Sequence, residues 1–220
     1  MKTTLPYQLW SDSKESVPTF YIHSFTGNGE EVWKACHQLQ CPSFNLVSIH
    51  GIDLDAALSP WQAEGVWKGQ APFKGEAAVH LQRILTEVIP AVEAELPQPS
   101  VYQAMAGYSL AGLFTLWTAL QTDTFQRVAS ISGSLWYPDF IPYLQKESHS
   151  FQPKCIYFSL GDKEKNTRHP LMKQVETCTQ EAVALAETLQ VPHVFEMNAG
   201  NHFTEPALRT AKAIYWLLNQ

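Results

Sequence analysis

Short apolar runs alternate along the chain with longer segments in which apolar residues recur at helical spacing. Each run is bounded by turn residues, which is typical of a strand buried on both faces of a sheet. The predicted strands cover residues 17–22, 44–49, 101–106, 127–132, 155–160 and 193–197. Amphipathic segments predict helices between them, at 30–39, 76–96, 110–120, 171–189 and 204–218, with a broken helical stretch at 136–146.

Strands that alternate with helices predict an α/β fold with a mainly parallel central sheet and helices on both faces. The 220 residues contain no linker, repeat or low-complexity tract, so we expect one domain over 1–220. The Pro-, Gly- and Trp-rich segment 51–75 predicts an aromatic-rich loop insertion. In such sheets ligands bind at the carboxyl ends of the strands, where the candidate residues below are expected.

Composition narrows the function classes. Hydrophobic residues make up 45% of the chain and charged residues 16%, which indicates an ordinary globular protein. A net charge of −6 without clustered Lys or Arg disfavours nucleic acid or an anionic membrane as partner. No apolar run of signal or spanning length is found, so we expect a cytoplasmic location, while the oligomeric state stays open. The four cysteines are expected to be reduced thiols: Cys36, Cys41, Cys155 and Cys178.

A serine stands where the strand at 101–106 is expected to turn into a helix. The stretch 107–112, GYSLAG, surrounds Ser109 with small residues, although Ala111 occupies the last place of the G-x-S-x-G pattern. Strand, tight turn and helix form the context of a nucleophile elbow, in which the glycines permit a strained backbone. The alternative is a serine that only caps the helix.

A serine nucleophile needs a base, and the base needs a carboxylate that orients it. His202 follows the last predicted strand in a loop of small residues and is the best candidate for the base. The segment after the strand at 155–160 holds two acids, of which Glu164 is favoured and Asp162 is the alternative. The order serine, acid, histidine is that of an α/β-hydrolase.

Acyl transfer also needs N–H donors aimed at the developing oxyanion. The backbone N–H groups of Leu110 and Phe25 are the candidates, and Ser24 occupies a place where glycine is usual. Loop aromatics could line the substrate pocket, with Trp67 and Phe73 as further candidates. The aromatics chosen as substrate-binding residues are Trp61, Trp136 and Tyr137.

His50 and the pair Asp53 and Asp55 raise the question of a metal site. The sequence around them has no EF-hand loop and no further ligand at useful spacing. We therefore expect neither a metal nor another cofactor.

With these residues placed, the chain resembles the Putative esterase family of α/β-hydrolases, whose relatives include esterase D, enterochelin esterases and mycolyltransferases. It is most similar to a compact bacterial branch without large lids or extra N-terminal domains. The resemblance implies that the acid falls third after the strand-ending Gly161, which favours Glu164. Some enterochelin-esterase relatives instead use a Ser-His dyad. The segments that carry the resemblance are 51–53, 59–61, 106–113, 132–136, 159–164 and 200–203.

The first functional hypothesis is a serine esterase that hydrolyses a small-molecule carboxylic ester or thioester through an acyl-serine. The second keeps that intermediate but passes the acyl group to another acceptor. The third, from a different class, is a hydrolase scaffold that has lost activity and is used for binding. The sequence does not choose the acyl or the alcohol group.

Overall fold

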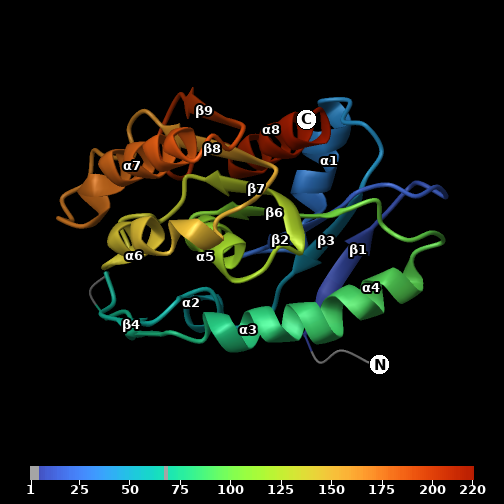
Figure 1. Cartoon of the computed structure of the whole chain (residues 1–220), viewed down its shortest axis with the longest axis horizontal. Helices are drawn as coiled ribbons and strands as arrows, with labels where there is room; N and C mark the ends of the chain where they lie inside the picture. Colours follow the sequence, from blue (N-terminus) through green and yellow to red (C-terminus); the bar gives the residue numbers. More distant parts are fainter. Residues whose placement is uncertain (1–4, 67–68) are drawn as a thin grey trace.

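A seven-stranded sheet forms the centre of the protein (Figure 1). The computed structural model describes residues 5–66 and 69–220. The strand order is β1-β3-β2-β6-β7-β8-β9, and only β1 runs antiparallel to its neighbour. The strands are β1 (Tyr7–Trp10), β2 (Thr19–His23), β3 (Asn45–Ile49), β6 (Gln103–Tyr108), β7 (Phe125–Ile131), β8 (Cys155–Gly161) and β9 (His193–Asn198).

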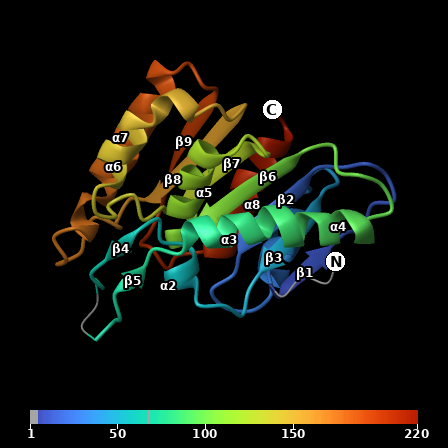
Figure 2. The ribbon, with the colours of Figure 1, turned by 60° about the horizontal axis from the view of Figure 1, so that its bottom comes forward.

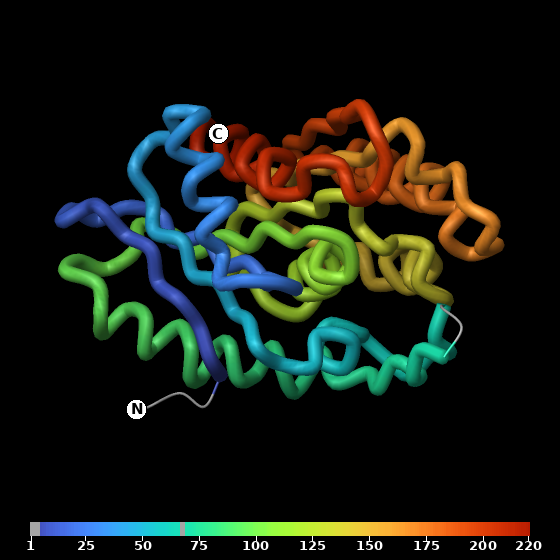
Figure 3. Tube along the Cα trace, turned by 180° about the vertical axis from the view of Figure 1, so that it is seen from behind, coloured from blue at the N-terminus to red at the C-terminus, as the bar shows by residue number. Residues whose placement is uncertain are grey.

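Helices cover both faces of this sheet, as predicted for an α/β-hydrolase fold. Figure 2 shows α3, α4 and α5 in front of the sheet, and Figure 3 shows α1 and α8 on the opposite side. One face carries α1 (Glu30–Gln38) and α8 (Pro206–Leu218). The other carries α3 (Ala77–Arg83), α4 (Ile89–Glu95), α5 (Leu110–Gln121), α6 (Phe140–Lys146) and α7 (Val175–Thr188). No helix in the described part of the chain is long and apolar enough to cross a membrane.

The central strands are buried on both faces, and β8 shows this most clearly because all of its residues are buried. Ile156 and Phe158 belong to the core under α5 and α7, whereas Cys155 and Tyr157 belong to the core under α1 and α8. Successive side chains of a strand point to opposite faces, so one apolar run supplies both cores.

Two elements differ from the sequence prediction. The edge strand β1 was not predicted, because it has only four half-buried residues and follows no long apolar pattern. The expected helix at 76–96 is interrupted by a π-helical segment, Ile84–Val88, before α4 begins. Pro90 lies in the first turn of α4 and has no N–H for the carbonyl four residues earlier, which explains the change in helical hydrogen bonding.

The segment 51–75 contains more regular structure than the predicted loop. It holds α2 (Leu54–Ala57) and a hairpin of β4 (Gln62–Ala63) and β5 (Phe73–Lys74). The carboxylate of Asp53 accepts a hydrogen bond from the Ala56 N–H at 3.2 Å and pairs with Lys74 at 2.8 Å. Asp53 therefore caps α2 and joins it to the hairpin.

Two histidines are buried together between β2 and α3. The Nε2 atoms of His23 and His80 lie 2.9 Å apart, and both rings pack against Phe114. Burial, with a smaller effect of Arg83, lowers the pKa of His80 to about 4. Burial and the neighbouring His80 lower the pKa of His23 well below the ordinary value. Both rings are therefore neutral in the folded protein near pH 7.

This buried pair predicts a loss of stability in mild acid. Histidines of the unfolded chain take up protons below about pH 6.5, while the buried pair stays neutral, so the unfolded state binds more protons and its free energy falls relative to that of the folded state. Between pH 7.5 and 5, denaturant unfolding should show a loss of about 1–2 kcal/mol for each histidine. His80→Gln should reduce the pH dependence, and His149→Gln, at an exposed position, should not. An unchanged pH dependence in His80→Gln would contradict this account.

Candidate active site

Ser109 lies at the sharp turn between β6 and α5. Its φ of 60° and ψ of −123° place a non-glycine residue in a strained region of backbone space, at a cost of about 1–3 kcal/mol. Hydrogen bonds hold this conformation in place. The Ser109 N–H donates to the Ile131 carbonyl at 3.0 Å, and the Ser109 carbonyl accepts from the N–H groups of Gly112 and Ser134. The turn therefore has the backbone geometry expected of a nucleophile elbow.

Gly107 allows the strand and the helix to approach closely. A Cβ atom at this position would lie 1.9 Å from the carbonyl oxygen of Ala111, which belongs to the backbone of α5. Neither atom can move away without displacing the backbone of β6 or of α5. The glycine before the serine is thus required by packing, and its φ is not positive.

The structure brings Ser109, His202 and Glu164 into one hydrogen-bonded series. The His202 Nε2 lies 2.9 Å from the Ser109 Oγ, and the His202 Nδ1 lies 2.8 Å from the Glu164 Oε2. A carboxylate can only accept, so Nδ1 carries the proton and Nε2 of the neutral ring accepts from the serine hydroxyl. The Tyr108 hydroxyl donates to the His202 carbonyl at 2.7 Å and holds the loop above β6.

The Glu164 carboxylate is buried, with its side chain only 2% exposed. Its Oε1 accepts hydrogen bonds from the Ser132 hydroxyl and the Gly161 N–H, each at 2.7 Å. Burial works to raise the pKa of Glu164, but hydrogen bonds from His202 and Ser132 outweigh it and leave the pKa below its ordinary value. The group is therefore a carboxylate at neutral pH.

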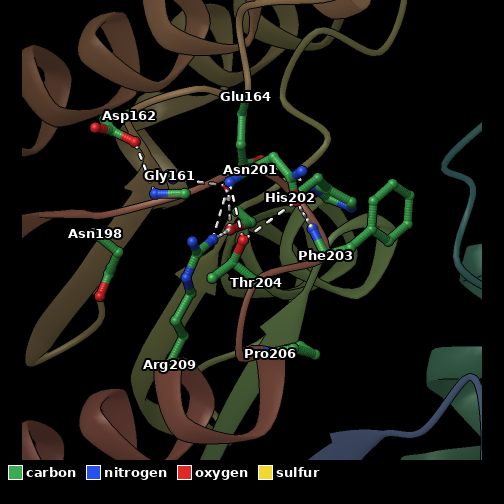
Figure 4. A network of polar contacts seen from close by, with 12 residues as sticks. Gly161, Asp162, Glu164, Asn198, Asn201, His202, Phe203, Thr204, Pro206 and Arg209 are labelled. Carbon is green, nitrogen blue, oxygen red and sulfur yellow. Dashed lines mark hydrogen bonds and ion pairs between the residues drawn. The ribbon is translucent and has the colours of Figure 1, made fainter.

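Arg209 is the charge partner that the sequence did not reveal. Its guanidinium is 2% exposed and lies 3.1 Å from the Glu164 Oε1 (Figure 4). The same group donates to the carbonyl of Ala199 and to the hydroxyls of Tyr108 and Ser132. The helical spacing of apolar residues places Leu208, Ala211, Tyr215 and Leu218 on one face of α8. Tyr215 is instead 45% exposed, and the inner face carries Arg209 because Glu164 needs a buried cation.

Asp162, the alternative acid, has a different position. Its Oδ1 accepts from the Gly200 N–H at 2.7 Å, and its own N–H donates to the Asn198 carbonyl at 2.8 Å. Figure 4 shows the Asp162 carboxylate directed away from His202. Asp162 therefore fixes the loop that carries His202 and makes no hydrogen bond to the ring itself.

The loop after β2 supplies the second candidate oxyanion donor. Ser24 has no positive φ, and its N–H donates to the Ile49 carbonyl at 2.9 Å, so serine causes no backbone strain where glycine is usual. Within the described residues, neither the Phe25 N–H nor the Leu110 N–H has a hydrogen-bond acceptor. Leu110 is also the first residue of α5, where helix N–H groups are unpaired and the helix dipole favours negative charge.

A cleft of about 720 Å³ contains Ser109 and His202. Its walls come from the loop after β2, the first turn of α1, the end of β6 and the first turn of α8. Phe25 and Phe203 contribute exposed aromatic rings to it.

The predicted substrate-binding aromatics do not line this cleft. Tyr137 is only 2% exposed, and its hydroxyl donates to the Trp61 carbonyl at 2.6 Å. Trp61 donates its indole N–H to Pro138 and packs on the Tyr137 ring. Trp136 is half-buried and outside the cleft lining. Trp61 and Tyr137 instead pack together beside the β4–β5 hairpin, where the Tyr137 ring contacts Phe73. Trp67 lies outside the described residues.

A mainly parallel sheet with a serine at the turn after a central strand defines an α/β-hydrolase. The family model described as Putative esterase matches residues 4–205, and the chain belongs to that family. It is thus a carboxylic ester hydrolase. A related sequence is YbbA of Bacillus subtilis, 22% identical over 173 residues, which cover 76% of this chain and 69% of YbbA.

Solved structures share the fold. An IroE-like serine hydrolase from Shewanella oneidensis has a TM-score of 0.81 at 16% identity, and the match covers 97% of this chain and 75% of that one. The siderophore hydrolase EstA from Aspergillus nidulans has a TM-score of 0.73 at 17% identity, over 97% and 90% of the two chains.

The close approach at Gly107 predicts the effect of a single methyl group there. Gly107→Ala should lower the free energy of unfolding by at least about 3 kcal/mol, because the new Cβ overlaps the backbone of α5. Gly27→Ala is the comparison, since a Cβ there has no neighbour within 4 Å and only the positive φ costs about 1 kcal/mol. Denaturant unfolding of both variants measures the difference. Equal losses of unfolding free energy would show that the structure relieves the clash at Gly107 with little cost in stability.

Proposed function

We propose that the protein hydrolyses a small-molecule carboxylic ester through an acyl-serine intermediate, with Ser109 as nucleophile, His202 as general base and Glu164 as the acid that orients the base. The observation that supports this most strongly is the continuous series of hydrogen bonds from the serine hydroxyl through the imidazole to the buried carboxylate. The same series argues against a scaffold whose catalytic geometry has been lost.

In the first half-reaction the Ser109 Oγ attacks the ester carbonyl carbon while its proton passes to the His202 Nε2. The carbonyl oxygen becomes an oxyanion, which the N–H groups of Phe25 and Leu110 stabilise. Each such donor contributes about 3 kcal/mol to lowering the barrier. His202 then gives the proton to the alcohol oxygen, the ester C–O bond breaks, and the acyl group stays on the serine.

In the second half-reaction water takes the place of the alcohol. His202 removes a proton from the water, the hydroxide attacks the acyl carbon, and the proton returns to the Ser109 Oγ as the carboxylic acid leaves. Glu164 remains ionised throughout. Its lowered pKa and its hydrogen bond to Nδ1 stabilise the imidazolium that forms in both half-reactions.

Removal of the nucleophile tests the proposal directly. Ser109→Ala should abolish labelling by a fluorophosphonate and reduce p-nitrophenyl acetate turnover by at least about 10⁴-fold. Ser134→Ala is a matched control, because Ser134 is buried near the elbow but its hydroxyl makes no hydrogen bond to the series. Equal labelling of Ser109→Ala and the native protein would remove Ser109 from this role.

Added alcohols distinguish hydrolysis from acyl transfer through the ratio of acid to transesterified product.

The two candidate acids give a second test. Glu164→Gln should lower kcat/KM by about 10²–10⁴-fold, because an amide neither fixes the Nδ1–H tautomer nor stabilises the imidazolium. Asp162→Asn keeps an oxygen that can accept from the Gly200 N–H, so its loss should stay within about tenfold. Circular dichroism and unfolding curves check that both variants fold. A larger loss in the Asp162 variant than in the Glu164 variant would reverse the assignment.

A further inference from the structure

The charged side chains that line the cleft are all acidic. Glu30 and Glu31 lie in the first turn of α1 and face the cleft, and its described lining contains no lysine or arginine. Glu30 pairs with Lys34 at 2.7 Å, on the same helix one turn later. Glu31 has no ion pair or side-chain hydrogen bond among the described residues. The cleft therefore carries uncompensated negative charge at Glu31, in a lining that also includes Ser109.

The same cleft also exposes apolar surface. Phe25 is 49% exposed and Phe203 is 78% exposed, and Val32, Pro206 and Ala207 extend the apolar lining. Figure 4 shows the Phe203 ring directed away from the hydrogen-bonded network around Glu164. Large aromatic side chains left open to solvent next to a catalytic group are typical of ligand contacts, and their faces attract cations.

We propose that the cleft selects esters whose bound group is apolar and either neutral or positively charged, with Glu31 as the main electrostatic determinant and Phe25 and Phe203 as the apolar contacts. This inference rests on the proposed function and names the substrate class of the same site. Anionic esters are disfavoured, because a bound carboxylate or sulfonate would face Glu31 while the described lining offers no lysine or arginine to compensate it.

Glu30 and Glu31 also have a structural role that must be separated from selection. Acidic residues in the first turn of a helix interact favourably with its dipole, so their loss could weaken α1. That effect would lower activity towards every ester by the same factor. A change in the ratio between charged and neutral substrates arises only if the carboxylate interacts with the bound group.

Matched esters that differ only in charge measure this ratio. In the alcohol series, acetylcholine is compared with its uncharged tert-butyl isostere and with the sulfonate analogue. In the acyl series, p-nitrophenyl esters carry a trimethylammonium, tert-butyl or carboxylate group at the acyl end. We expect kcat/KM of the cation to exceed that of the anion by at least about fivefold in one series or both, since a carboxylate near the protein surface supplies a modest interaction.

Glu31→Gln should bring the cation-to-anion ratio of kcat/KM to within about twofold of unity, whatever its effect on the neutral ester. Glu181→Gln is the matched control, because this exposed glutamate lies on α7 outside the cleft lining, and its ratio should equal that of the native protein. Raising the ionic strength from about 0.02 to 0.5 M should bring the cation-to-anion ratio of kcat/KM of the native protein closer to unity. The ratio of Glu31→Gln should stay unchanged.

The inference is overturned if the anionic ester is preferred in either series, if both series show no preference, or if Glu31→Gln keeps the native ratio. Failure of the proposed function has a different signature. In that case no ester in either series would be turned over in a manner that depends on Ser109, and fluorophosphonate labelling would be absent.

Discussion

The buried carboxylate of Glu164 is the group on which the site depends. A charge removed from water is costly unless it is paired and its lone pairs accept hydrogen bonds. Arg209 supplies the opposite charge, and Ser132, Gly161 and His202 supply the remaining donors. These partners come from α8, the loop after β7, the end of β8 and the loop after β9. One carboxylate therefore fixes the positions of these four segments relative to one another.

The parallel sheet makes this convergence possible. Strands β6, β7, β8 and β9 are neighbours and run in the same direction, so their carboxyl ends lie at one edge. Ser109 follows β6, Ser132 follows β7, and His202 lies in the loop after β9. The strained backbone at Ser109 can persist there because β7 and the loop after it satisfy the hydrogen bonds of the turn.

Much of this arrangement follows from the sequence, and the parts that do not have identifiable causes. Apolar runs predict the buried strands because both faces are covered, and the order serine, acid, histidine follows from topology. The residues alone left Asp162 and Glu164 open, since both follow β8 and only the course of the loop decides which reaches His202. Arg209 escaped prediction because periodicity assigns apolar residues to the inner face of a helix, whereas here that face holds an ion pair.

The aromatics chosen from the sequence do not line the cleft, for a related reason. Trp61 and Tyr137 lie in loops, but their polar atoms bond to backbone carbonyls and their rings pack on one another. Phe25 and Phe203 are the aromatics that do reach the cleft. They lie within two residues of His23 and His202, but no periodic pattern of apolar residues predicts that their side chains are exposed.

The buried network around Glu164 and the rim of the cleft thus face different physical constraints. In the network, Glu164 and Arg209 are each buried and bonded to several groups, so a substitution there leaves an unpaired charge or an unsatisfied donor. At the rim, Glu31 and Phe203 are exposed and contribute little to the core, so they can change at small cost in stability. Substitutions that change the ester preference are therefore expected at the rim, because substitutions in the buried network also cost stability.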